Sequence, residues 1–152
     1  MIARFESREA AMKNSERPEQ GKWWEETEKC FDGPVRFHDT DDVQLMSHGE
    51  LDSAHFVQVM EGHVSDRQKL DELEHKADSV LAEMRPDLLG SVTAYFDDGE
   101  FTEVAYFTSE AAARQGERGE MSKEMASMFA EWERLMKVEK YIDINDPWLV
   151  RA

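Results

Sequence analysis

The chain has 152 residues, and 34 acidic against 18 basic side chains give it a formal net charge of -16. No run or stripe of Lys and Arg is present, which excludes the usual nucleic-acid surface and a polybasic membrane anchor. Hydrophobic residues make up 40% of the chain, so the composition predicts a globular protein with a heavily charged surface, not a disordered one.

The cysteine content and the hydropathy pattern predict a cytoplasmic protein. Cys30 is the single cysteine, which excludes an intrachain disulfide, disfavours a cysteine-based metal site and suits a reducing compartment. The first residues lack the apolar stretch of a signal peptide, and no apolar run approaches about 18 residues. We therefore expect neither export nor a membrane span.

The first 46 residues are predicted to hold two strands and two helices. Residues 1–5 and 35–39 are expected to be strands, the second because apolar and polar residues alternate in it. Between them, Ser7 caps a first helix. A second helix ends at a Gly-Pro pair and carries a largely aromatic face, formed by Trp23, Trp24, Thr27, Cys30 and Phe31. The polar residues 47–54 are expected to be a linker.

A strand and a long helix open the region after this linker. Residues 56–60 are apolar on both alternations, which indicates a strand whose two faces are both covered. The helix begins at Ser65, which has Gln68 at capping-box spacing, and it keeps apolar residues at helical spacing. It must end before Pro86.

A hairpin, two helices and a last strand complete this region. Segments 91–96 and 101–107 flank an Asp-Gly turn, which predicts the hairpin. Ser109 caps a short alanine-rich helix, and a longer helix with one large apolar stripe begins near Ser122. Residues 138–144 alternate as a half-buried strand. The element order of residues 55–152 is therefore β-α-β-β-α-β.

The opening segment resembles the second half of that unit, which indicates an internal duplication. Both copies run strand, Ser-capped helix, second helix and alternating strand. Five residues of the first copy match residues of the second at an offset of 102: Ala3, Phe5, Ser7, Ala10 and Ala11 against Ala105, Phe107, Ser109, Ala112 and Ala113. We therefore predict a partial repeat over 1–46, a linker over 47–54 and a complete unit over 55–152.

This β-α-β-β-α-β unit, with strands apolar on both faces and an aromatic helix before the last strand, resembles the dimeric α/β-barrel superfamily that includes antibiotic biosynthesis monooxygenases. The resemblance implies an α+β, ferredoxin-like fold whose sheets pack face to face, either between subunits or between fused repeats. It also implies that the partial N-terminal repeat keeps only two strands, whose shared central neighbour is missing.

Three explanations of the missing strand remain open. The two strands pair directly with each other, or they borrow a strand from another chain in a homodimer or from a strand-completing partner, or the coding sequence begins upstream of Met1. We favour the last, because Met1 lies in mid-strand, where a domain boundary is unusual.

The resemblance further implies a pocket between sheet and helices that binds a small, flat, hydrophobic or aromatic molecule. Some members of the superfamily oxidise aromatic polyketides with dioxygen and no cofactor, so we expect none here. The candidate pocket residues are Gln58, Tyr95, Tyr106 and Trp132. His63, at a strand end near a helix start, is the candidate for proton transfer. Ordinary core packing is the competing interpretation of the aromatic residues.

Haem and metal chemistry are not expected. Haem-degrading relatives use an Asn on the first strand and a Trp with a His on the later helices, whereas this chain has Trp132 there without the other two. The densest group of potential metal ligands is His38, Asp39, Asp41 and Asp42. Neighbouring residues of an alternating strand point to opposite faces, which favours a solvated strand end over a metal site.

Two functions follow from these observations. The first is a small-molecule-binding α/β-barrel protein that acts as a cofactor-independent monooxygenase on a flat aromatic substrate. The alternative is a non-catalytic ligand-binding or stress-associated interaction module. An enzyme needs a hydrated pocket with convergent polar groups, whereas an interaction module fills that space with side chains.

Overall fold

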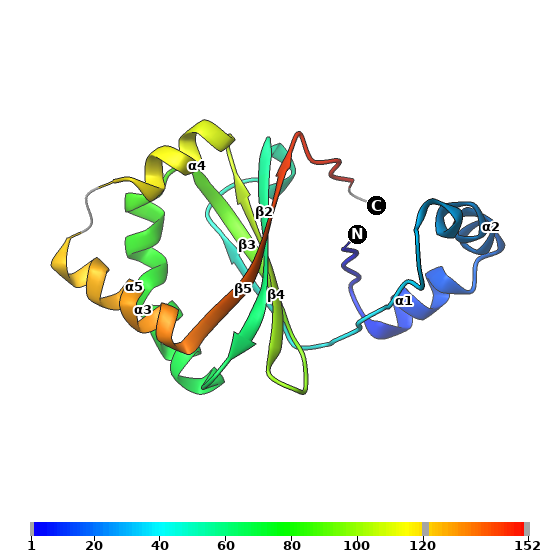
Figure 1. The fold of residues 1–152 in the computed structure, drawn as a ribbon, viewed down its shortest axis with the longest axis horizontal. Coiled ribbons are helices and arrows are strands. Elements are labelled where there is room, and N and C mark those ends of the chain that lie inside the picture. The colour runs from blue at the N-terminus through cyan, green and yellow to red at the C-terminus, as the bar shows by residue number, and fades with distance from the viewer. Residues whose placement is uncertain (1, 120–121, 151–152) are drawn as a thin grey trace. The chain divides into compact units, whose positions relative to one another are not determined.

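The computed structural model describes residues 2–119 and 122–150, and the chain divides into two compact units (Figure 1). Unit 1 is Met1–Asp41 and unit 2 is Asp42–Ala152. The division falls before the linker predicted over 47–54, because residues 43–47 form a strand that belongs to unit 2.

Unit 1 is a helical hairpin. It contains α1 (Arg8–Ser15), α2 (Pro18–Thr27) and the 3-10 turn η1 (Glu28–Cys30). Ser7 caps α1 as predicted, since its Oγ accepts a hydrogen bond from the Ala10 N–H at 3.1 Å. The ring of Trp24 packs edge-on against Phe37, with the ring centroids 4.9 Å apart.

The strands predicted at 1–5 and 35–39 are not present. Residues 2–5 and 35–39 have no regular secondary structure, and Met1 lies outside the described residues. A strand needs a neighbour to satisfy its backbone N–H and C=O groups, and no strand in the described part pairs with either segment. The tandem repeat is therefore not supported.

Unit 2 is an α+β fold with one antiparallel sheet, and the fold class predicted for it is confirmed. The sheet has the strand order β1-β3-β4-β2-β5. Its strands are β1 (Val43–Ser47), β2 (Phe56–Val64), β3 (Leu88–Tyr95), β4 (Glu100–Phe107) and β5 (Met136–Asn145), with the turn η2 (Leu51–Ser53) between the first two. The helices α3 (Arg67–Met84), α4 (Glu110–Glu117) and α5 (Lys123–Leu135) cover one face of the sheet (Figure 1).

Local signals explain most of these elements. Ser109 and Ser122 cap α4 and α5 as predicted, by accepting the N–H groups of Ala112 and Met125. Gly99 has a φ of 82°, as the hairpin turn requires. The cap of α3 differs from the prediction. Asp66 accepts the Lys69 N–H, whereas the Ser65 hydroxyl lies 3.2 Å from the Leu135 carbonyl.

The sheet has two different faces. The face under the helices, here called the helix face, holds the larger core, which includes Phe56, Met60, Phe101, Ala105 and Phe107. The opposite face, here called the outer face, holds a smaller core that includes Val57, Val59 and Val104. The prediction that both faces of β2 are covered is thus confirmed.

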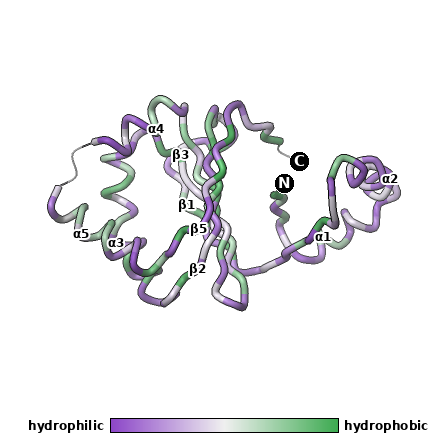
Figure 2. Tube along the Cα trace, in the orientation of Figure 1, coloured by the Kyte–Doolittle hydropathy of each residue, from purple (hydrophilic) through white to green (hydrophobic). Residues whose placement is uncertain are grey.

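The helices of unit 2 are amphipathic and alternate between hydrophobic and hydrophilic positions along their length (Figure 2). Leu70, Leu73 and Ala77 are the buried residues of α3. Across residues 2–119 and 122–150, no helix combines the length and apolarity that a membrane span requires.

Candidate functional site

A group of polar side chains lies between the sheet and the helices of unit 2, on the side where the sequence predicted a pocket. Its members come from five different elements, and we call it the interior polar cluster: Gln44 of β1, Glu74 of α3, Tyr95 of β3, Glu103 of β4 and Trp132 of α5.

Strand register sets the direction of the β-strand members. Glu103 pairs with Thr93 of β3 and with Met60 of β2, and both partners are buried on the helix face. Gln44 pairs with the same Thr93 from the other side. Because residues directly opposite each other in neighbouring strands share a face, Gln44 and Glu103 both point toward the helices.

A chain of hydrogen bonds connects the cluster. The Tyr95 hydroxyl donates to Gln44 Oε1 at 3.3 Å, and Gln44 Nε2 donates to Glu74 Oε2 at 2.7 Å. The indole N–H of Trp132 also donates to the Glu74 carboxylate. Glu74 is thus held by donors from two elements besides its own.

The two carboxyl groups of the cluster bind protons more tightly than ordinary glutamates. Burial raises the pKa of Glu74, although the hydrogen bond from Gln44 and the charge of Arg67 oppose the shift. Burial also raises the pKa of Glu103 to about 7, where the Ser91 hydroxyl opposes the shift and the charge of Glu74 adds to it. Glu103 therefore exchanges its proton near neutral pH, which is a property of many catalytic acids and bases.

Solvent reaches part of most side chains of the cluster. Gln44, Glu74, Glu103 and Trp132 are only half-buried, although they lie on the helix-covered face and Glu103 is on the middle strand. Protein surrounds the carboxyl group of Glu103 densely enough to raise its pKa, yet solvent still reaches part of the side chain.

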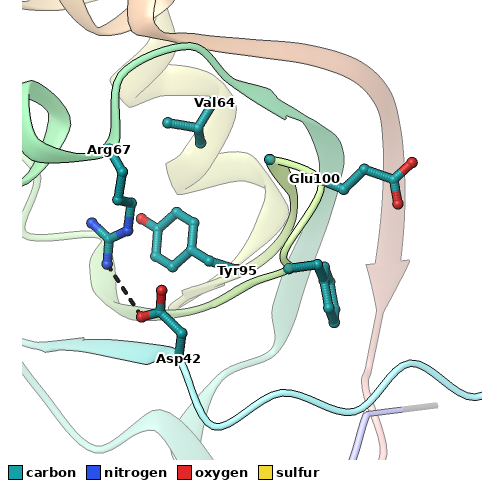
Figure 3. Close-up of a pocket in the computed structure, with 7 residues that line it drawn as sticks. Asp42, Val64, Arg67, Tyr95 and Glu100 are labelled. Atoms are coloured by element: carbon teal, nitrogen blue, oxygen red, sulfur yellow. Dashed lines mark ion pairs between the residues drawn. The ribbon is translucent and has the colours of Figure 1, made fainter.

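Arg67 lies at one end of the interior polar cluster, next to Tyr95. Its guanidinium lies over the Tyr95 ring, with Cζ 3.6 Å from the ring centroid, and Nη2 lies 3.6 Å from Asp42 Oδ1 (Figure 3). It also forms an ion pair with Asp71. Burial and the charge of Glu74 hold the pKa of Tyr95 well above its usual range, so the phenol stays neutral and remains a hydrogen-bond donor.

A small pocket opens beside Arg67 (Figure 3). Its volume is about 100 Å³, below the ~300 Å³ at which pockets for drug-sized ligands begin. The residues that line it are Asp42, Val64, Arg67, Tyr95, Phe96, Gly99 and Glu100. Tyr95 belongs to both the pocket and the interior polar cluster, so the pocket lies at the edge of the cluster.

The structure brings two of the predicted site residues together and separates the others. Tyr95 and Trp132 both belong to the interior polar cluster. Gln58 shares the helix face but donates to Asp143 Oδ1 at 2.9 Å, near the end of α4, where Arg114 pairs with the same carboxylate. Tyr106 packs against the smaller core of the outer face.

His63 also lies on the outer-face side of β2, opposite Glu100 in the register. Its side chain is half exposed, and its ring nitrogens lie 3.8 Å from Glu100 Oε1 and 3.6 Å from Glu139 Oε2. The strand itself separates His63 from the interior polar cluster. In the described ranges, no group of three His, Cys, Asp or Glu side chains is arranged to hold a metal ion.

Three members of the cluster were missed at the level of sequence: Gln44, Glu74 and Glu103. The sequence pattern around Glu103 does predict that its side chain faces the helices. Glu103 shares its alternation with Phe101, Ala105 and Phe107, so an acidic residue occupies an inward position of an otherwise apolar series. Gln44 could not be placed, because its strand was not predicted.

Comparison with known proteins adds evidence on the fold. No protein-family profile and no curated protein matches the chain. A candidate monooxygenase from Lactobacillus acidophilus superposes with a TM-score of 0.62 at 13% identity, over 94% of this chain and 68% of that one. SnoaB, a cofactor-independent oxygenase from Streptomyces nogalater, gives a TM-score of 0.51 at 11% identity, over 65% of this chain and 99% of that one. The chain thus has a ferredoxin-like fold that is similar to the folds of these two proteins.

Proposed function

We propose that this protein binds a small aromatic molecule and acts as a cofactor-independent monooxygenase. The observation that carries the proposal is the interior polar cluster, in which the Glu103 carboxyl group lies near Glu74 and Tyr95, and Trp132 donates to Glu74. The cluster lies between sheet and helices, where the fold resemblance implies the ligand. The likeness in fold to SnoaB supports the same reaction class.

The proposed reaction needs few protein groups. A ring CH₂ group that is conjugated through aromatic rings with a carbonyl loses a proton, and the electron pair that remains is delocalised over the rings and the carbonyl oxygen. This carbanion reduces dioxygen, so that one oxygen atom becomes a new carbonyl and the other leaves as water. The protein has to exclude bulk water, hold the rings and accept the proton.

The residues of the cluster suit these tasks. The Trp132 ring, which stacks on Phe129 with centroids 5.9 Å apart, offers an aromatic surface for a flat ligand. The neutral Tyr95 phenol and the Gln44 amide can hydrogen-bond a ligand oxygen. The pocket beside Arg67, which Tyr95 also lines, is the proposed place for the edge of such a ligand.

A homodimer is the proposed assembly, formed through the outer face of the sheet. Exposed apolar side chains stand at both edges of this face: Val43 and Leu45 on β1, and Ile142 and Ile144 on β5. Leu45 is 51% and Ile144 39% exposed. Covering such residues with a second sheet removes apolar area from water. The exposed thiol of Cys30 suits the reducing cytoplasm as the proposed location.

Oxygen uptake tests the proposed function. The purified protein, treated with a chelator, is mixed with anthrone, a tricyclic aromatic ketone with an acidic ring CH₂ group, in an oxygen electrode. We expect uptake well above the rates of buffer and of heat-denatured protein, with one dioxygen consumed for each product. Quenching of tryptophan fluorescence without oxygen uptake would instead support the alternative, a ligand-binding module.

A further inference from the structure

We propose that Glu103 is the catalytic base that takes the proton from the substrate, and that Glu74 is a positioning residue that acts on it. This inference rests on the proposed function and deepens it. Neither residue was a candidate from the sequence, where proton transfer was assigned to His63.

The position of Glu103 is unusual for a structural residue. It lies on the middle strand of the sheet, on the helix face, between the core residues Phe101 and Ala105. No Lys, Arg or His of the described part forms an ion pair with it. By contrast, Arg85 and Asp87, which are also half-buried, pair at 2.7 Å between Nη2 and Oδ2. Because an unpaired interior carboxylate opposes folding, packing alone does not account for Glu103.

The surroundings of Glu103 favour a base that works at neutral pH. The ionisable groups that act on it or feel its charge are Glu74 from α3, Tyr95 from β3 and Tyr141 from β5. Burial, together with the charge of Glu74, sets the pKa of Glu103 at about 7. A base of this pKa is about half ionised at neutral pH and still binds a proton strongly, which is the efficient range for proton transfer.

The step itself is a simple proton transfer. The C–H bond of the ring CH₂ group breaks, the proton goes to a carboxylate oxygen of Glu103, and the electron pair stays on the substrate. Glu103 then returns the proton to water, which reaches part of its side chain. Glu74 takes no proton from the substrate. Its carboxylate, held by Gln44 and Trp132, keeps the proton affinity of Glu103 high through its negative charge.

Hydrogen exchange under nitrogen isolates this step from oxidation. Anthrone is incubated with the protein in D₂O without dioxygen, and the loss of ring CH₂ protons is followed by NMR. We expect the wild-type rate above the buffer background to rise with pH through about 7. Glu103→Gln, which keeps the shape of the side chain, should lower that rate by about 100-fold or more. Glu83→Gln, an exposed change on α3, is the matched control and should behave as wild type.

Two further variants separate chemistry from folding. Glu103→Asp keeps a carboxylate and should recover part of the exchange that Glu103→Gln loses. Glu74→Gln should keep the exchange but move the midpoint of its pH profile down by about one unit, because a neighbouring negative charge is gone. A purely structural role of either residue predicts neither result.

The outcomes separate this inference from the proposed function. Oxygen uptake by wild type, together with unchanged exchange and an unchanged pH profile in Glu103→Gln, overturns the role of Glu103 and leaves the oxygenase proposal standing. A wild-type protein that neither exchanges nor oxidises anthrone overturns both.

Discussion

Gln44 Nε2 lies 2.7 Å from Glu74 Oε2, and this hydrogen bond joins the edge strand β1 to helix α3 across the interior of unit 2. The same Gln44 side chain accepts from the Tyr95 hydroxyl through Oε1. One amide thus connects three elements around the interior polar cluster and fixes the orientation of the Glu74 carboxylate.

Replacing this amide should destabilise the fold. Gln44→Leu removes one of the two donors to the half-buried Glu74 carboxylate, so the free energy of unfolding at pH 8 should fall by about 1–3 kcal/mol. The loss should be smaller at pH 5, because the hydrogen bond lowers the pKa of Glu74 and its removal raises that pKa further. Urea denaturation at both pH values measures the effect.

A matched control for Gln44→Leu exists on the surface of α3. Gln68 Nε2 donates to Glu72 Oε1 at 3.3 Å in an exposed pair, so Gln68→Leu removes the same kind of bond without the burial. Its effect should stay within about 0.5 kcal/mol. Equal effects of the two substitutions would contradict the role given to the interior bond.

The pH dependence of stability should reveal the ionisation of Glu103. Its pKa is about 7 in the folded protein against 4.5 for an unperturbed glutamate, so the folded state binds more protons than the unfolded state between these values. The contribution of Glu103 to the free energy of unfolding is therefore fully present below about pH 4.5 and is lost as the pH rises through about 7.

Removing the carboxyl group should abolish this loss. Glu103→Gln should match wild type near pH 4.5 and exceed it above pH 8 by at most about 3 kcal/mol. Glu83→Gln again serves as the control and should follow the wild-type curve. A wild-type protein and a Glu103→Gln variant with parallel stability curves from pH 5 to 8 would show that Glu103 has an ordinary pKa.

Tryptophan fluorescence should report ligand binding from one position. Trp132 lies in the cluster, whereas Trp148 is 94% exposed near the end of the described chain. Fluorescence titration with anthrone should show quenching in wild type and in Trp148→Phe. The quenching should be largely lost in Trp132→Phe, which also removes the indole donor to Glu74. Equal quenching in both variants would place the ligand elsewhere.

Charge on the outer face should separate the proposed dimer. Leu45→Lys combined with Ile144→Lys puts cations among the exposed apolar residues of β1 and β5, which should prevent two sheets from packing. Light scattering should give the mass of two chains for wild type and of one chain for the double variant. Met84→Lys, at a 39% exposed position of α3, is the control and should remain dimeric. A monomeric wild type would refute the assembly.

The elements that the sequence predicted correctly are those with strong local signals. Helix α3 has a cap, a regular apolar stripe and a proline that ends it, and the β3–β4 hairpin has its Asp-Gly turn. The segment 35–39 also alternates, yet it is not a strand, since alternation cannot supply a neighbouring strand. Residues 43–47 pair with β3, far along the chain, which no local pattern could indicate.

The candidate site was predictable to a similar degree. Tyr95 and Trp132 could be chosen by residue type and element, and the structure places both in the cluster. The alternation of side chains along a strand determines the sheet face of the other candidates. Tyr106 follows the inward-facing Ala105, so it lies on the outer face, and His63 follows the inward-facing Gly62, so it lies on the outer face too. Applied to 101–107, the same rule would have identified Glu103.

The central claim is that the protein is a cofactor-independent monooxygenase, and the incorporation of oxygen from dioxygen into the product tests it most directly. The chelator-treated protein is supplied with anthrone and ¹⁸O₂ in unlabelled water, and the product is analysed by mass spectrometry. A cofactor-independent monooxygenase predicts one ¹⁸O atom in each product molecule, formed at a rate that rises with pH through about 7. Product that carries no label above the protein-free background would contradict the account.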